Sequence, residues 1–146
     1  HDKYNEVNSH HFLLEDIDGH IDFGEGMNGI YAHGENYQIL NQHHGYAQLV
    51  TNTYGKGRSI YFAGLPYSPQ NCRLLLRAIY WAAGKEDEMK KYYVSNVNTE
   101  VASFESVGKI AVINNTTEAL CTDLYVSGNK VETLNLSPME LRWITI

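Results

Sequence analysis

The order of apolar and polar positions predicts a β-hairpin in the first half of the chain. Residues 46–54 and 58–64 have the composition of strands, and Gly55-Lys56-Gly57 between them is typical of a turn. Residues 60–63 are apolar without alternation, which favours a strand covered on both faces, as in an α/β sheet. The first 45 residues, rich in polar residues and glycine, predict loops and one or two short strands.

A helix is predicted directly after the hairpin. Ser68 suits the N-cap, Pro69 suits the first helical position, and Gly84 predicts the end. One apolar face with helical spacing consists of Cys72, Leu75, Leu76, Ile79 and Ala83. A second apolar face beside it consists of Leu74, Ala78, Trp81 and Ala82. The remaining polar strip consists of Arg73, Arg77 and Tyr80. The pattern therefore predicts a helix that is buried on more than one side.

The character of the chain changes near residue 90. The charged residues 85–91 predict a solvated linker, and the apolar period after it changes to two. Strand-like segments follow at residues 109–113, 119–126, 131–136 and 139–146. In the last segment Met139, Leu141 and Trp143 share one face, which we expect to point into a core. The overall fold class predicted is α+β, with a piece of α/β sheet followed by a small antiparallel β-sandwich or a sheet packed on the preceding unit.

Composition and charge exclude several classes of protein. Hydrophobic residues make up 43% and charged residues 19%, which argues for a folded domain and against disorder. The net charge of −6 offers no broad positive surface for a phosphate backbone, so we expect no nucleic-acid partner. No apolar run is long enough to cross a bilayer, and no signal-peptide pattern opens the chain, so we expect no membrane partner. The two cysteines are not needed for a core, which favours the reducing cytoplasm.

Residues 16–25 overlay most of a calcium-binding EF-hand loop. Asp16, Asp18 and Glu25 fall on positions 3, 5 and 12 of that pattern. Position 1 is Leu14, however, and the exiting helix would have to run through several glycines. The favoured interpretation is a tight acidic turn between strands, without a metal.

Histidine and cysteine residues provide two further candidates. The pairs His10-His11 and His43-His44 stand at no recognised zinc spacing and are interpreted as surface histidines, so no metal site is predicted. Cys72 lies in the first helical turn, where a thiol can become nucleophilic, but its apolar face favours core packing. No nucleophile set is identifiable, and the carboxylates are too scattered to select a pair. No catalytic residue is therefore predicted.

The loop before the helix is the best candidate for contact with a ligand. The segment Gly64-Leu65-Pro66-Tyr67-Ser68 leaves the end of a buried strand and enters a helix, where α/β sheets bind ligands. Tyr67 could stack on a sugar, and we take it as the substrate-binding candidate. The alternative is a Leu-Pro-Tyr anchor packed on neighbouring structure. Two glycosylation-type patterns, Asn114-Asn115-Thr116 and Asn135-Leu136-Ser137, are interpreted as turn residues.

An ordered set of motifs resembles the C-terminal part of the lacto-N-biose phosphorylases, also called 1,3-β-galactosyl-N-acetylhexosamine phosphorylases. The motifs, in chain order, are Asp2-Lys3-Tyr4-Asn5, Ile21-Asp22-Phe23-Gly24-Glu25-Gly26-Met27, residues 54–61, Gly64-Leu65-Pro66-Tyr67-Ser68, residues 71–75 and residues 78–83. Asn114-Asn115-Thr116 and the closing strand also resemble the small terminal β-domain of that family. The resemblance covers nearly all of the chain.

The resemblance implies a large parent enzyme with a catalytic (β/α)8 barrel, a middle domain similar to class I glutamine amidotransferases, and terminal β-domains. Such enzymes cleave a β-galactosyl bond with inorganic phosphate and inversion, giving galactose 1-phosphate and an N-acetylhexosamine without a cofactor. A barrel needs about 250 residues, more than this chain holds. Residues 1–88 are then the end of the glutamine-amidotransferase-like domain and residues 89–146 the C-terminal β-domain.

On this interpretation the fragment is inactive alone. Its partners are the catalytic barrel and, through the parent enzyme, phosphate and a galactosyl disaccharide, with homo-oligomer formation left open. Two alternatives remain: a carbohydrate-binding module without chemistry, and the accessory region of a β-galactosidase. Exposed aromatic residues in one plane would favour the first, whereas the alternation around Trp143 is typical of a core residue.

Overall fold

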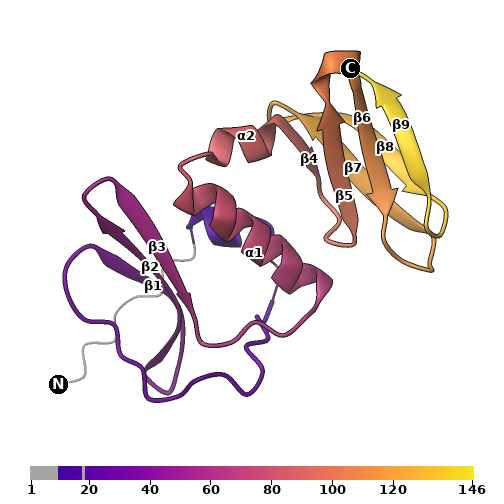
Figure 1. Ribbon diagram of the computed structural model, residues 1–146. Coiled ribbons are helices and arrows are strands. Elements are labelled where there is room, and N and C mark those ends of the chain that lie inside the picture. The colour runs from indigo at the N-terminus through magenta and orange to yellow at the C-terminus, as the bar shows by residue number, and fades with distance from the viewer. Residues whose placement is uncertain (1–9, 18) are drawn as a thin grey trace. The chain divides into compact units, whose positions relative to one another are not determined.

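A small antiparallel sheet and one long helix form the first part of the fold. The computed structural model describes residues 10–17 and 19–146 and divides into two compact units, residues 1–85 and 86–146, here called unit 1 and unit 2 (Figure 1). The motif Asp2-Lys3-Tyr4-Asn5 and Asp18 lie outside the described residues. The elements of unit 1 are η1 (Phe12–Leu14), β1 (Tyr37–His43), β2 (Tyr46–Tyr54), β3 (Gly57–Phe62) and α1 (Pro69–Ala82).

The predicted hairpin is confirmed. Strands β2 and β3 pair antiparallel, with Tyr54 opposite Gly57 at the turn, and β1 adds to the other side of β2 in the order β1-β2-β3. The expectation that β3 is covered on both faces is correct only for its second half. Ile60 and Phe62 pack on the core shared with α1, and Tyr61 packs on a small cluster on the other face, but Gly57–Ser59 are exposed.

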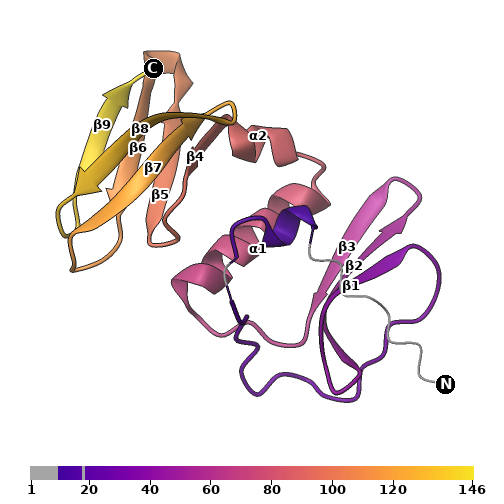
Figure 2. The ribbon, with the colours of Figure 1, turned by 180° about the vertical axis from the view of Figure 1, so that it is seen from behind.

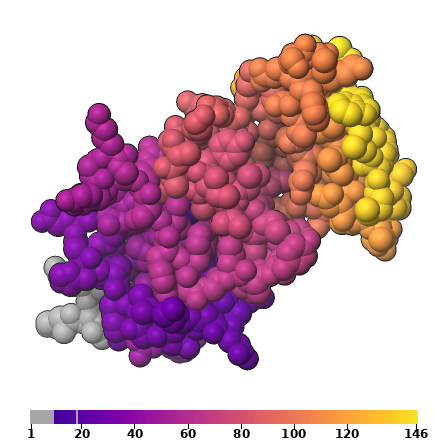
Figure 3. Space-filling view, in the orientation of Figure 1, coloured from indigo at the N-terminus to yellow at the C-terminus, as the bar shows by residue number. Residues whose placement is uncertain are grey.

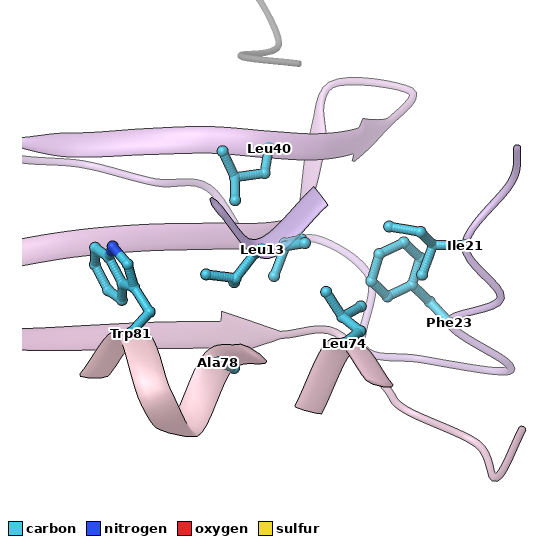
Figure 4. Packing of buried hydrophobic residues seen from close by; sticks show 8 residues of the cluster. Leu13, Ile21, Phe23, Leu40, Leu74, Ala78 and Trp81 are labelled. Carbon is cyan, nitrogen blue, oxygen red and sulfur yellow. The ribbon is translucent and has the colours of Figure 1, made fainter. Parts of the chain in front are cut away.

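The core of unit 1 lies between the sheet and α1. Figure 4 shows Leu13 of η1 between Leu40 of β1 and the buried face of α1, and Figure 2 shows η1 lying against that helix. Leu13 is fully buried and lies between Phe12 and Leu14, which pack against the same core while only partly buried. An apolar residue from the N-terminal loop therefore completes a core that the hairpin and the helix leave open.

Helix α1 has the predicted ends but buries a different set of residues. Ser68 caps it, with its Oγ accepting from the Asn71 N–H at 3.0 Å, and Gly84 follows with a left-handed φ of 67°. Of the apolar face predicted from Leu74, Ala78, Trp81 and Ala82, the first three residues are buried and Ala82 is exposed. The prediction was wrong for the other apolar face, whose members Cys72, Leu75, Leu76, Ile79 and Ala83 are exposed. It was also wrong for the polar strip, because Arg73 and Arg77 are buried.

Unit 2 is a sandwich of two antiparallel sheets. Its elements are α2 (Glu86–Lys91), β4 (Tyr92–Val94), β5 (Thr99–Phe104), η2 (Glu105–Val107), β6 (Lys109–Asn114), β7 (Leu120–Val126), β8 (Asn129–Leu136) and β9 (Leu141–Thr145). The sheets have the strand orders β4-β7-β8 and β5-β6-β9. Side chains from both sheets form one core, made of Val94, Ile110, Val112, Leu124, Leu134 and Leu136.

Two sequence predictions for unit 2 are wrong. The segment expected to be a solvated linker forms α2, whose first turn is acidic, whose last turn is basic, and whose Met89 is buried. The apolar face of β9 points outward: Met139, Leu141 and Trp143 are 65%, 49% and 54% exposed, while Ile144 packs on the core. Strands β4 and β5 were not predicted, because β4 is short and β5 carries few apolar residues. Among the described residues, no helix is long and apolar enough to cross a membrane.

Candidate functional site

The loop between β3 and α1 is joined to residues 22–27, which lie far earlier in the chain. The Met27 N–H donates to the Ala63 carbonyl at 2.9 Å. The side chain of Asn71 holds both segments, because its Nδ2 donates to the Asp22 carbonyl at 2.9 Å and to the Pro66 carbonyl at 2.8 Å. These two acceptors also determine the orientation of the amide. The two most specific sequence motifs of the chain, residues 21–27 and 64–68, therefore form one structure.

Glycines make this close approach possible. A Cβ on Gly64 would lie 2.3 Å from the Phe23 carbonyl oxygen, and a Cβ on Gly26 would lie 2.7 Å from the Ala63 carbonyl oxygen. Real side chains do not reach such distances from a backbone atom, so neither position accepts another residue without movement of the chain. The glycine positions of the two motifs are thus explained by backbone packing.

The joined segments present an exposed aromatic ring and two exposed carboxylates. Tyr67 is 89% exposed, so the alternative of a packed anchor is wrong for this side chain. Leu65 provides the anchor instead, because it packs against the core of unit 1. Asp22 and Glu25 are exposed on the partner segment, and Asp22 Oδ1 accepts from the Gly24 N–H at 2.7 Å. A ring and carboxylates on a rigid loop can stack on a pyranose and accept hydrogen bonds from hydroxyls.

The acidic segment expected to form a turn between strands forms an ion-pair cluster on α1. Asp16 Oδ2 accepts from Arg73 Nη1 at 2.9 Å, and Asp16 Oδ1 accepts from Arg77 Nε. Arg77 Nη1 also donates to the Phe12 carbonyl at 2.9 Å. Among residues 10–17 and 19–146 the first strand begins at Tyr37, so the expected strands do not flank this segment in that part of the chain. Asp16 stands at the third position of the calcium pattern, but both of its carboxylate oxygens accept from guanidinium groups. These contacts hold the η1 segment against the helix.

The histidines fall into two groups. His10, His43 and His44 are exposed, as predicted for surface residues. His11 is half-buried instead: its Nδ1 accepts from the Leu13 N–H at 3.2 Å, and its ring packs against Trp81. Within residues 10–17 and 19–146, no group of three or more histidine, cysteine or acidic side chains is placed to hold a metal ion.

Asn114 has a structural role in unit 2. Its side chain is fully buried, with Nδ2 donating to the Glu118 and Ser137 carbonyls at 2.8 Å each and Oδ1 accepting from the Thr116 N–H and hydroxyl. Asn114 is the last residue of β6, and its side chain closes the turn that follows; the turn prediction is wrong for Asn135 and Leu136, which lie in β8.

The outer face of the β5-β6-β9 sheet carries aromatic side chains that sequence reasoning assigned to the core or did not single out. Trp143 stands opposite Ala111 of β6, and its ring lies 5.2 Å from that of Phe104, centre to centre. Phe104 is 44% exposed, whereas Ala111 below the rings is buried. The two ring planes are inclined by 56° and so do not form one flat platform. The alternation along β9 shows which residues share a face of the strand, but not whether that face points into the core or into solvent.

Comparison with known proteins connects both units to a single family. A family model described as the lacto-N-biose phosphorylase central domain matches residues 1–87, and one described as the lacto-N-biose phosphorylase C-terminal domain matches residues 92–144.

Individual relatives give the same result. A 1,3-β-galactosyl-N-acetylhexosamine phosphorylase of Lachnoclostridium phytofermentans is 43% identical over 144 residues, 99% of this chain and 20% of that protein. The protein of the same name from Bifidobacterium longum subsp. longum is 40% identical over 125 residues, 86% of this chain and 17% of its own length. A D-galactosyl-β-1→4-L-rhamnose phosphorylase of L. phytofermentans is 35% identical over 78 residues, 53% of this chain and 11% of its own. The chain spans about a fifth of the length of the first relative.

Proposed function

Because this chain belongs to the lacto-N-biose phosphorylase family, we propose that it is the non-catalytic C-terminal part of an inverting galactosyl phosphorylase. The observation that carries the proposal is coverage: a phosphorylase aligns with 99% of this chain through only 20% of its own length. Residues 1–88 are assigned to the end of a glutamine-amidotransferase-like domain and residues 89–146 to a C-terminal β-domain. The change from a sheet-and-helix unit to a sandwich near residue 86 supports this assignment.

The proposed reaction of the parent is phosphorolysis of a β-galactosyl-N-acetylhexosamine. Phosphate oxygen attacks the anomeric carbon of galactose, the glycosidic C–O bond breaks, and an acidic residue of the catalytic barrel gives its proton to the departing oxygen. The products are galactose 1-phosphate, with inverted configuration, and the free N-acetylhexosamine. No cofactor enters this balance. We place the enzyme in the cytoplasm, where inorganic phosphate is available, and leave self-association as a further proposal.

Tyr67 is proposed as a contact of this chain with the disaccharide. Its exposed ring stands on a loop held by Asn71 and by the glycine contacts, and a rigid support favours a defined stacking geometry. Tyr54 is the matched control, because it is also 89% exposed and belongs to the same unit. In the parent enzyme, Tyr67→Ala should raise KM about fivefold with kcat unchanged, as expected for lost ground-state binding of about 1 kcal/mol. Equal kinetics for Tyr67→Ala and Tyr54→Ala would reject this contact.

Product analysis tests the proposed function. Lacto-N-biose and inorganic phosphate are supplied to the 146-residue chain and to the full-length parent in parallel. Galactose 1-phosphate from the parent alone is the expected result. Galactose 1-phosphate from the isolated chain would overturn the non-catalytic assignment, and free galactose without its phosphate would indicate the β-galactosidase alternative.

Glycan binding without chemistry is a second candidate, because Trp143 and Phe104 are neighbouring exposed rings, although their planes are inclined by 56° and not coplanar. Trp143 does not belong to the core, so the alternation around it no longer argues against this function. Titration of the isolated chain with lacto-N-biose, followed by tryptophan fluorescence in a Trp81→Phe background, tests it. Saturable quenching that Phe104→Ala weakens would support a glycan site on unit 2, and an unchanged signal would reject it.

A further inference from the structure

The outer face of α1 is apolar and exposed over most of its length. Four residues share this face at helical spacing, here called the α1 stripe: Cys72, Leu75, Leu76 and Ile79. Leu75, Leu76 and Ile79 are 44%, 43% and 58% exposed. Figure 3 shows the outer side of α1 at the molecular surface, uncovered by the rest of unit 1. The stripe runs from Cys72 to Ile79, about two turns or roughly 10 Å of the helix axis, so it is a ridge rather than one isolated side chain.

No charged side chain of α1 lies on this exposed face. The charged residues of α1 are Arg73 and Arg77, and both are buried, at 7% and 3% exposure. Asp16 binds both guanidinium groups on the inner side, which withdraws them from the solvent-facing surface. The exposed side of a helix normally carries charged residues, and a contiguous apolar patch marks a contact surface.

The inner side of α1 is already used. Leu74, Ala78 and Trp81 cover the core that the helix shares with the sheet. A helix that is apolar on two opposite sides is typical of the interior of a domain, with a layer on each side. The described part of unit 1 supplies one of these layers, so a second layer is missing at the stripe.

The length of the relatives offers a source for that layer. A phosphorylase that aligns with 99% of this chain has four fifths of its length outside the alignment, since the chain covers 20% of it. The matched domains are named central and C-terminal, so in such a relative most of the remaining length lies before them. A second copy of this chain is the weaker occupant: a symmetric contact through one stripe of four side chains falls short of the roughly 1,200–2,000 Å² that stable interfaces bury.

We infer that the α1 stripe packs against the part of the parent phosphorylase chain that precedes residue 1. This inference rests on the proposed function, because it requires a parent chain, and it assigns a surface to the contact. The stripe then fastens the C-terminal part to the catalytic part, with apolar side chains of the preceding chain covering Leu75, Leu76 and Ile79.

Cys72 reports on the contact directly. Both cysteines, Cys72 and Cys121, are exposed in this chain. We expect iodoacetamide to alkylate both in the isolated chain, as followed by peptide mass spectrometry. In the full-length parent the rate at Cys72 should fall by about tenfold or more, as expected for a residue that reacts only after local opening, and urea should restore it. Equal rates at Cys72 in the isolated chain and in the parent would overturn the inference.

A pair of variants tests the energetics of the same contact. Ile79→Glu places a carboxylate in the stripe, and Ile79→Leu is the matched apolar control. In the isolated chain both should leave the melting temperature unchanged, because the side chain faces water. In the parent Ile79→Glu should lower the melting temperature and Ile79→Leu should not. An isolated chain that sediments as a dimer and dissociates with Ile79→Glu would overturn the inference in favour of a second copy.

The test separates this inference from the proposed function. A parent that forms galactose 1-phosphate while its Cys72 reacts freely contradicts the stripe contact alone. A parent that protects Cys72 but performs no phosphorolysis contradicts the proposed function alone.

Discussion

Arg73 donates from Nη1 to Asp16 Oδ2 at 2.9 Å, across 57 residues of sequence, and thereby ties the N-terminal loop to α1. The same carboxylate accepts from Arg77, and all three groups are largely withdrawn from water. Two buried guanidinium groups therefore share the buried carboxylate of Asp16. A second carboxylate lies nearby, with Glu15 Oε2 at 3.6 Å from Arg77 Nη1. The cluster determines both which side of α1 is buried and which loop covers it.

Removal of the shared carboxylate should strongly destabilise unit 1. Asp16→Asn keeps the shape of the side chain but removes the negative charge that the buried Arg73 and Arg77 share, which costs about 3–5 kcal/mol in comparable pairs. The measurement is urea unfolding followed by Trp81 fluorescence in a Trp143→Phe background. Glu105→Gln, which breaks the exposed pair with Lys91 in unit 2, is the control and should leave this transition unchanged. Equal midpoints for wild type and Asp16→Asn would show that the cluster contributes nothing.

A methyl group at Gly64 should disrupt the joined motifs. Its position 2.3 Å from the Phe23 carbonyl oxygen cannot be relieved by a rotamer, so the backbone must move, and we expect a loss of about 1–3 kcal/mol or more. Gly57→Ala is the matched control, because its Cβ would lie 3.4 Å from the nearest atom, the Tyr54 carbonyl oxygen. Thermal unfolding of the two variants checks the prediction. Equal melting temperatures for Gly64→Ala and Gly57→Ala would contradict it.

Substitutions at Asn71 should separate its donor function from its volume. Asn71→Ala removes two hydrogen bonds, at about 1–3 kcal/mol for each carbonyl left unsatisfied. Asn71→Asp should be worse at neutral pH, because an ionised carboxylate would face the carbonyl oxygens of Asp22 and Pro66. Those oxygens disfavour the ionised form and raise its pKa in the folded state. The stability of Asn71→Asp should therefore recover as the pH falls, which urea unfolding across pH 4–8 would show; a flat profile would contradict it.

Unit 2 should lose stability in acid through two surface carboxylates. The hydrogen bond from Lys130, with a second from Thr133, lowers the pKa of Asp123, and the Ser137 N–H, with Arg142, lowers the pKa of Glu140. For a lowered pKa the stabilisation is complete above the unfolded-state value, about 4 for these groups, and disappears as the pH falls through the folded value.

Melting curves between acid and neutral pH, followed by Trp143 fluorescence in a Trp81→Phe background, measure this effect. The double variant Asp123→Asn, Glu140→Gln should be less stable than wild type at neutral pH and should show a shallower decline in acid. If the double variant loses stability in acid as steeply as wild type, other titratable groups cause that loss.

Local features of this protein could be predicted well, and the direction of its amphipathic elements could not. The hairpin, the Ser68 cap and the helix end at Gly84 depend on residues within a few positions of one another, so they can be predicted from the sequence. The loop of Tyr67 could be located for the same reason, but the structure shows Tyr67 exposed and Leu65 packed on the core in its place.

Periodicity along the chain shows which residues share a face, but contacts formed on folding select the face that is buried. Helix α1 has two apolar faces of similar quality, and Asp16 from a distant loop selected between them by drawing Arg73 and Arg77 inward. For β9 the predicted alternation is correct, but the face predicted to be buried is exposed. Trp143 contacts Phe104 on the outer face of the sheet, while Ile144 packs on the core. A periodic pattern defines faces only relative to one another, and partners far away in the chain determine which of them excludes water.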